Sequence, residues 1–278
     1  MQTLPHTKIP TIVYRTFDGV ARHVANLVAQ TIREANNAGR PAVLGLPTGS
    51  TPIGVYRELI RLHREEGLDL SRCLTFNLDE YFPMVPSSIH SYRRWMKENF
   101  FDHVNIPAEN IHLPLGDIPR HQVESFCAEY ERKIEAAGGI DLQLLGIGRT
   151  GHIGFNEPGS DHDTLTRMVS LDPVTRKDAA SDFYGEDSVP LQAITMGVGS
   201  ILKAKHVVMM ALGEHKAKVV KRAVEGEITT TVAASFLQEH PRACFVLDAA
   251  SAASIARPNN RLILSRISWA SCAVTSPS

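Results

Sequence analysis

Short apolar runs alternate with longer amphipathic stretches along most of this chain. The runs are rich in β-branched and other apolar residues, as expected for strands buried on both faces of a sheet. Between them, apolar residues recur at three- and four-residue spacing, which is typical of helices. The predicted strands are 11–15, 42–46, 73–77, 142–147, 206–212 and 243–248, and the predicted helices are 20–35, 56–63, 88–101, 119–137 and 214–225.

Strands that alternate with helices predict an α/β fold with an open, mostly parallel, doubly wound sheet and helices on both faces. Such a Rossmann-like sheet is joined by right-handed crossovers. We expect Asp18 to cap the first helix.

Two regions depart from this alternation. Residues 159–190 are polar, rich in Asp and Ser, and lack strong periodicity. So long a loop in a compact domain is more often a lid over a functional site than a plain connection. The final stretch turns Ala/Ser-rich and shows no pattern to which we assign chemistry. No repeat or linker divides the remainder, so we expect one α/β domain over 1–250 and an atypical tail over 251–278.

Charge and hydropathy exclude several classes of function. The 278 residues include 29 basic and 30 acidic side chains, so nothing indicates capture of nucleic acid or of an anionic membrane. No run approaches the roughly 20 apolar residues of a membrane span. The first residues lack the apolar core of a signal peptide. We therefore expect a cytoplasmic protein.

The cysteines and histidines give no sign of a metal site. Cys73, Cys127, Cys244 and Cys272 are scattered, and buried thiols are a better interpretation than disulfides or metal ligands. There is no HExxH motif and no close cluster of His and Asp. We expect no metal and no cofactor.

Three segments, 47–52, 78–82 and 148–158, each follow the carboxyl end of a predicted strand. In open α/β sheets that edge is where ligands bind, so these segments can converge on one site.

Segment 148–158 is the most distinctive of the three. Glycines at 146, 148, 151 and 154 allow positive φ and close approach to a ligand. The segment presents His152, Asn156 and Glu157. A histidine suits proton transfer near neutral pH, and Glu157 could orient it or raise its pKa. A lone histidine is more often structural, but the surrounding glycines favour a functional one.

Residues 146–151 also match GxGxxG, which could indicate a dinucleotide site. In that motif the third glycine opens a long helix, and here Gly154 and Pro158 prevent one. A GxSxG nucleophile elbow is absent, because Gly197–Ser200 has the wrong order.

Segment 47–52 leads from a strand into a helix through Gly49, Ser50 and Thr51. Free backbone N–H groups at a helix start bind anions, and hydroxyl groups add donors. The Walker A spacing is missing, and a plain strand-to-helix turn is an equal alternative. Lys216, near another predicted helix start, makes phosphate binding the better interpretation.

Asp79 and Glu80 directly follow the third predicted strand. A part-buried carboxylate at this position could act as a general base. The alternative is helix or turn capping.

Five motifs occur together in order, and with them the chain resembles the glucosamine-6-phosphate deaminase (isomerase) family over roughly residues 10–248. The related 6-phosphogluconolactonases share the fold but not the pair NLDEY and GHIGFNEP. The motifs are GLPTGSTP at 45–52, NLDEY at 77–81, GRTGHIGFNEP at 148–158, TMGVG at 195–199 and LGEHK at 212–216.

The resemblance implies a hydrolase of amino-sugar catabolism. It would isomerise and deaminate glucosamine 6-phosphate, or a close aminosugar phosphate, to fructose 6-phosphate and ammonia. Asp79 matches the base that moves a proton between C2 and C1, and His152 the residue that assists ring opening, with Glu157 as its partner. Gly49, Ser50, Thr51 and Lys216 form the corresponding phosphate site. The family also implies a homo-oligomer, with no cofactor and no metal.

Departures from the family pattern concern the catalytic loop and the lid. Thr150 stands where an aspartate is usual, which predicts a weaker and less rigidly oriented His152. Asp182 stands near the place of a phosphate-binding arginine, for which Arg176 or Arg167 are possible replacements.

The family's allosteric pocket is matched by Ser160 and Arg167, with Val169 in place of a lysine. These departures leave two alternatives open. One is a catalytically weakened regulator that binds sugar phosphates, and the other is a different sugar-phosphate isomerase or lactonase.

Overall fold

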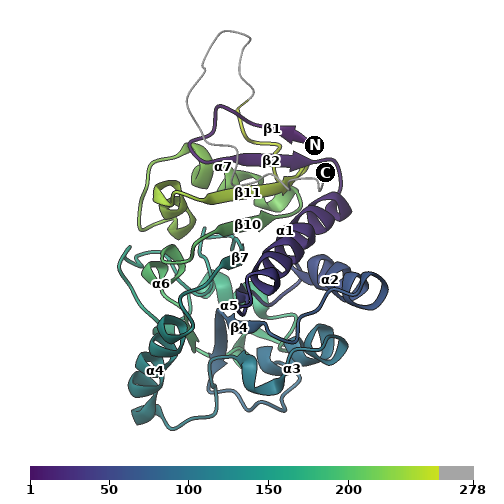
Figure 1. Cartoon of the computed structure of the whole chain (residues 1–278). Coiled ribbons are helices and arrows are strands. Elements are labelled where there is room, and N and C mark those ends of the chain that lie inside the picture. The colour runs from purple at the N-terminus through teal and green to yellow at the C-terminus, as the bar shows by residue number, and fades with distance from the viewer. Residues whose placement is uncertain (257–278) are drawn as a thin grey trace.

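The computed structural model describes residues 1–256. Within them, an eight-stranded sheet has the order β1-β2-β11-β10-β7-β3-β4-β6, and every neighbouring pair except β1 and β2 is parallel (Figure 1). The predicted mostly parallel α/β sheet is thus confirmed. Its strands are β1 Gln2–Thr3, β2 Thr11–Tyr14, β3 Val43–Leu46, β4 Leu74–Asn77, β6 Ile111–His112, β7 Leu142–Gly146, β10 Val207–Ala211 and β11 Ala243–Asp248.

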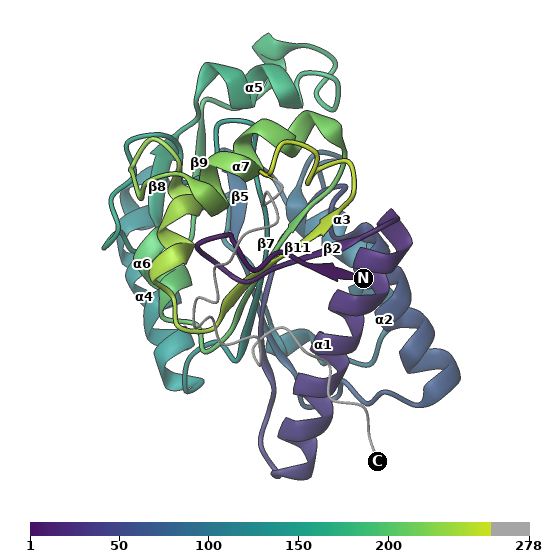
Figure 2. The same cartoon turned by 90° about the horizontal axis from the view of Figure 1, so that it is seen from above.

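Helices cover both faces of this sheet (Figure 2). On one face lie α1 Phe17–Asn37, α2 Ile53–Glu66 and α3 Tyr92–Asn99; on the other lie α4 Val123–Ala136, α6 Val198–Leu202 and α7 Ala217–Glu225. A strand between two helical layers is apolar at every position. In β10, Val208 and Met210 pack against the first layer, and Val207 and Met209 against the second. Short 3-10 helices lie at 101–103, 108–110, 120–122, 186–188, 214–216 and 233–239.

The chain reverses its direction of travel across the sheet between β3 and β7, which are neighbours. From β3 it continues outward to β4 and β6, whereas from β7 it continues the other way to β10 and β11. The carboxyl ends of β3 and β7 therefore flank a topological switch point, the usual ligand site of open α/β sheets.

A second sheet of three antiparallel strands lies beyond the carboxyl ends of the strands of the large sheet. It has the order β5-β9-β8, with β5 at Asp79–Phe82, β9 at Gln192–Thr195 and β8 at Arg167–Ser170. Asp79 and Arg167 both pair with Thr195 of the central strand. The sequence pattern did not predict this sheet, because its strands, DEYF, RMVS and QAIT, mix polar and apolar residues and form no apolar run.

The segment 159–190 is more ordered than predicted. Besides β8 it contains α5, Pro173–Ala179, whose start is capped by Asp172. In Figure 2, α5 projects past the end of the central sheet, beside the small sheet. Its role as a lid stays a prediction.

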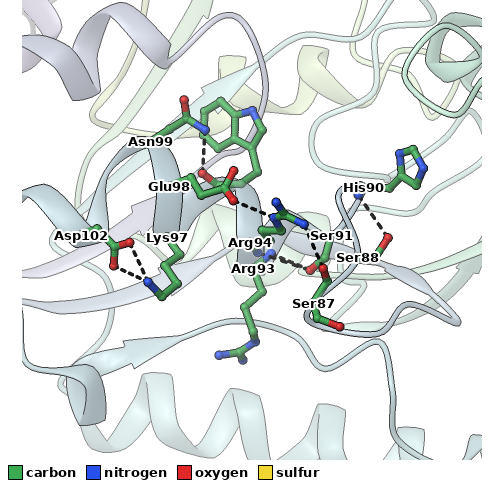
Figure 3. A network of polar contacts seen from close by, with 11 residues as sticks. Ser87, Ser88, His90, Ser91, Arg93, Arg94, Lys97, Glu98, Asn99 and Asp102 are labelled. Carbon is green, nitrogen blue, oxygen red and sulfur yellow. Dashed lines mark hydrogen bonds and ion pairs between the residues drawn. The ribbon is translucent and has the colours of Figure 1, made fainter.

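At two of the helix starts that differ from the prediction, a Ser or Thr side chain explains the observed start. Thr16, not Asp18, caps α1 by accepting a hydrogen bond from the Gly19 backbone nitrogen. Helix α3 begins at Tyr92, not at 88, because Ser91 accepts hydrogen bonds from the first turn (Figure 3). The helices predicted from 119 and 214 begin as α-helices at 123 and 217, each after a short 3-10 helix.

The remaining predictions concern the cysteines and the tail. Cys73, Cys127 and Cys244 are buried, as expected, whereas Cys272 lies outside the described residues, like most of the 251–278 tail. In the described part of the chain, no helix has the length and apolar character required to cross a membrane.

Candidate active site

The three predicted loops meet in one cavity of about 310 Å³ at the switch point. Segment 47–52 forms one wall, Gly146–Arg149 and His152 another, and Asp79 and Lys216 also line it. Glu157 and Thr150 stand behind His152, outside the lining. Sequence analysis thus selected residues that the fold brings together, although their roles stay predictions.

Segment 47–52 is held open as a strand-to-helix turn. Gly49 has φ +116°, a conformation that glycine adopts without strain. The Tyr56 hydroxyl donates a hydrogen bond of 2.5 Å to the Pro47 carbonyl and fixes the loop to α2. No side chain caps the first turn of α2, which begins after Pro52. Its backbone N–H groups are therefore available to an anion.

The neighbours Asp79 and Glu80 have opposite roles because successive residues of a strand point to opposite sides. Glu80 accepts hydrogen bonds from the Ser91 hydroxyl and from the backbone nitrogens of Tyr81, Tyr92 and Arg93. It therefore holds the start of α3. Capping, the alternative weighed for the pair, describes Glu80 alone.

Asp79 lines the cavity and accepts no hydrogen bond from any residue between 1 and 256. It is only 6% exposed. Burial, assisted by the negative charge of Glu80, raises the pKa of Asp79 to about 8. A carboxylate with such a pKa can take and return a proton near neutral pH.

Oxygen atoms surround one nitrogen of the His152 ring. Its Nδ1 lies 3.0 Å from Glu157 Oε2, 3.0 Å from the Thr150 hydroxyl and 3.3 Å from the Thr175 hydroxyl. Burial alone would raise the pKa of Glu157, but the hydrogen bond and charge of His152 outweigh it and lower that pKa. Glu157 is therefore an ionised partner for an imidazolium.

This geometry corrects the expectation for Thr150. The predicted loss of orientation does not occur, because Thr150 itself contacts Nδ1 and Glu157 and Thr175 support the same atom. Whether His152 is a weaker base stays a prediction.

Two glycines allow the close packing of segment 148–158. A Cβ on Gly148 would lie 2.0 Å from His152 Nε2, so only glycine leaves room for the ring. Gly154 has φ +57°, and a Cβ there would lie 2.7 Å from the Thr195 hydroxyl. No helix follows Gly151, so the dinucleotide motif lacks its structural context.

Asn156, one of the three polar residues singled out in this segment, is structural. It is fully buried and donates hydrogen bonds to the carbonyls of Ile153 and Met196. It fixes segment 148–158 against the turn that follows β9.

Two cations line the cavity. Burial lowers the pKa of Lys216, the charge of Asp178 opposes this shift, and Arg149 adds to it. Arg149 also forms an ion pair of 3.3 Å with Asp178 of α5. Sequence analysis missed Arg149, although its position in the glycine-rich loop after β7 was the available signal.

Comparison with known proteins shows the family of this chain. A family model described as glucosamine-6-phosphate isomerases/6-phosphogluconolactonase matches residues 15–245. The chain belongs to this family.

Individual members are similar along most of the chain. The glucosamine-6-phosphate deaminase of Thermoanaerobacter pseudethanolicus is 43% identical over 88% of this chain and 94% of its own length. A deaminase-like protein of Bacteroides thetaiotaomicron is 43% identical over 94% of this chain, which spans 40% of that longer protein. A solved monomeric glucosamine-6-phosphate deaminase has a TM-score of 0.84 and 38% identity, covering 88% of this chain and 99% of its own.

The two arginines considered as possible replacements for the family's lid arginine do not line the cavity. Arg176 donates a hydrogen bond to the Glu186 carbonyl, and Arg167 to Asn156 and Ser160. The arginine that lines the cavity is Arg149, which comes from a different segment.

Asp182 lines the cavity at an exposed position beside Tyr81. Burial raises the pKa of Tyr81 to about 12, a hydrogen bond with Tyr92 opposes the shift, and the charges of Asp79 and Asp182 add to it. Charges of both signs line the cavity: Lys216 lies near Asp178 and Arg149, whereas Asp79 and Asp182 lie near Tyr81.

Proposed function

We propose that this protein is a glucosamine-6-phosphate deaminase that converts an aminosugar phosphate and water to a ketose phosphate and ammonia. The observation that carries the proposal is Asp79, a buried carboxylate without hydrogen-bond partners among the described residues, in one cavity with His152. The names of the relatives at 43% identity support the same reaction.

The charge distribution supports one orientation of the substrate. The phosphate would lie against the open first turn of α2, with Ser50, Thr51, Lys216 and Arg149 as donors. The reacting carbons C1 and C2 would then lie between Asp79 and His152.

The chemistry needs one acid and one base. Protonated His152, stabilised by Glu157, would give a proton to the ring oxygen while a water molecule takes one from the C1 hydroxyl, which opens the ring. Asp79 would take the proton from C2 while the aldehyde oxygen at C1 gains a proton. It would then return its proton to C1 while the nitrogen loses one, so that C1 becomes an alcohol and the amine at C2 an imine. Water adds to C2 and ammonia leaves, which gives the ketose phosphate.

Ammonia release from glucosamine 6-phosphate by the purified protein and by Asp79→Asn tests the proposal. Loss of a positioned general base lowers the rate by about 10²–10⁴-fold. The variant keeps the shape of the side chain, and a thermal melt checks that it is folded. Equal rates for the two proteins would exclude Asp79 as the base.

A regulator that binds sugar phosphates without turnover is the second candidate. The carboxylate of Asp182 in the cavity lining favours it, because a second negative charge opposes a bound phosphate. Ligand binding to the folded state alone raises the melting temperature. Stabilisation by glucosamine 6-phosphate without ammonia release would support this candidate, and product analysis separates both from a lactonase or another isomerase.

A further inference from the structure

A second cavity of about 680 Å³ adjoins the candidate active site. Its size lies within the range of small-molecule sites, roughly 300–1,000 Å³. It opens on the other side of segment 47–52, towards α3, so a ligand can occupy both cavities at once. The residues that line both are Thr48, Gly49, Ser50, Tyr81, Tyr92 and Asp182.

The chemistry of this second cavity differs from that of the first. Among the described residues that line it, none is a lysine or an arginine, and Asp182 is its one carboxylate. It therefore provides no counter-charge for a phosphate. Aromatic rings supply much of its wall, including Tyr92, Trp95 and His90.

Hydrogen-bonding atoms without partners accompany these rings. The Thr48 hydroxyl is buried and has no partner within residues 1–256. In Figure 3, Asn99 uses its Nδ2 for the Trp95 carbonyl, which leaves its Oδ1 without a drawn contact, and the His90 ring points away from the polar network of α3. The Thr48 hydroxyl, as a buried group without a partner among residues 1–256, calls for one such as a ligand hydroxyl, and the part-exposed Asn99 Oδ1 lines the same cavity.

Tyr184, an exposed aromatic residue in an unusual backbone conformation, lies outside the lining of the second cavity but next to the lining residue His90, where it forms an aromatic rim. Tyr184 is 84% exposed and has φ +59°, the only positive φ of a non-glycine residue within residues 1–256. Its ring lies edge-on to His90 at 5.8 Å, and His90 stacks on Phe183 at 4.4 Å. A bulky residue held at positive φ costs free energy, which points to a function for the exposed ring.

We propose that this second cavity and its aromatic rim bind a neutral sugar ring attached to the aminosugar phosphate. The apolar faces of a pyranose pack on aromatic rings, and its hydroxyls would donate to Asp182 and Asn99 and accept from Thr48. The inference rests on the proposed function. Because ring opening needs a free C1, the second ring is attached through O3 or O4 of the aminosugar. Asp182 then serves as a hydroxyl acceptor in the subsite.

Steady-state ammonia release from glucosamine 6-phosphate and from its 4-O-β-glucosyl derivative tests the subsite. We expect kcat/KM for the derivative to equal or exceed that for the monosaccharide. Removing a ring by Tyr184→Gly or His90→Ala should lower kcat/KM about tenfold for the derivative alone, through KM. Tyr184→Gly relieves the positive φ, so the loss of the ring is separated from a loss of folding. Tyr184→Phe keeps the ring and should behave as the parent protein.

The outcomes separate the two proposals. If the monosaccharide releases ammonia and the derivative does not, or if both variants affect the two substrates equally, the subsite is wrong and the deaminase stands. If neither compound releases ammonia, the deaminase is wrong, and calorimetric binding of the two compounds decides the subsite. If the derivative binds no more tightly than the monosaccharide, the subsite proposal is overturned.

Discussion

The two sheets of this protein contribute differently to it. The large parallel sheet is apolar on both faces and lies between two helical layers, so burial of apolar area stabilises it. The small antiparallel sheet carries Asp79 and the buried cap Glu80 on one short strand, next to the cavity. The large sheet therefore positions the loops through the packing of its strands. The small sheet holds carboxylates next to the cavity, where they can serve the chemistry but where the burial of a charge costs free energy.

The largest expected effect is a difference in unfolding free energy between matched Val→Ala substitutions in the two sheets. Val208→Ala in β10 removes methyl groups from a site that is fully buried between helical layers, and should cost about 2–3 kcal/mol of unfolding free energy. Val169→Ala in β8 removes the same groups from a half-buried site and should cost about 1 kcal/mol or less. Urea unfolding of both variants measures the difference. Equal losses of unfolding free energy would contradict the view that apolar burial stabilises the large sheet more than the small one.

Within the small sheet, neighbouring carboxylates should respond in opposite directions. Asp79→Asn removes a buried charge without partners and should stabilise the protein by about 2 kcal/mol near pH 8. Because folding raises the pKa of Asp79, the charged side chain costs stability as pH rises from about 4 to 8, so the gain should vanish in acid.

Glu80→Gln, the control, weakens the hydrogen bonds to the start of α3 and should cost about 1–3 kcal/mol. Melting temperatures at several pH values compare the two variants. Destabilisation by both would show that Asp79 is structural.

The pH dependence of turnover gives the next effect. A base with a pKa of about 8 is half ionised at pH 8 and about one-tenth ionised at pH 7, so kcat/KM should fall about fivefold between these pH values. The rate is lost as pH falls, because the protonated carboxyl cannot accept the C2 proton. A kcat/KM profile that stays flat below pH 8 would mean that another group is the base, because kcat/KM reports the pKa of the free enzyme.

The same contrast explains what could be predicted from sequence. The strands of the large sheet follow from apolar runs, and Asp79, His152 and Lys216 follow from the rule that ligands bind at the carboxyl ends of parallel strands. Which of Asp79 and Glu80 faces the cavity depends on the pairing of β5 with β9, more than a hundred residues later, so no local pattern reveals it.

The contacts that hold the His152 ring could not be predicted from sequence, for a related reason. Thr175 lies on the seven-residue helix α5, inside a polar segment without periodicity, and meets Nδ1 only after folding. Arg149 and Asp178 form an ion pair between the same two segments, the glycine-rich loop and α5. Contacts between a glycine-rich loop and a short polar helix produce no periodic pattern of apolar residues, so they cannot be predicted from the sequence.

The smallest expected effect concerns Thr150, which contacts His152 in segment 148–158 and for which the family resemblance predicts an aspartate. Thr150→Val keeps the shape and removes the hydroxyl from Nδ1, but Glu157 and Thr175 remain, so kcat should fall by about threefold or less. Thr150→Asp adds a second carboxylate beside Glu157. Because two adjacent carboxylates oppose each other's ionisation, much of the gain in His152 basicity is offset, and kcat should change by less than about tenfold. A change of a hundredfold or more in either variant would mean that residue 150, not Glu157, governs the ring.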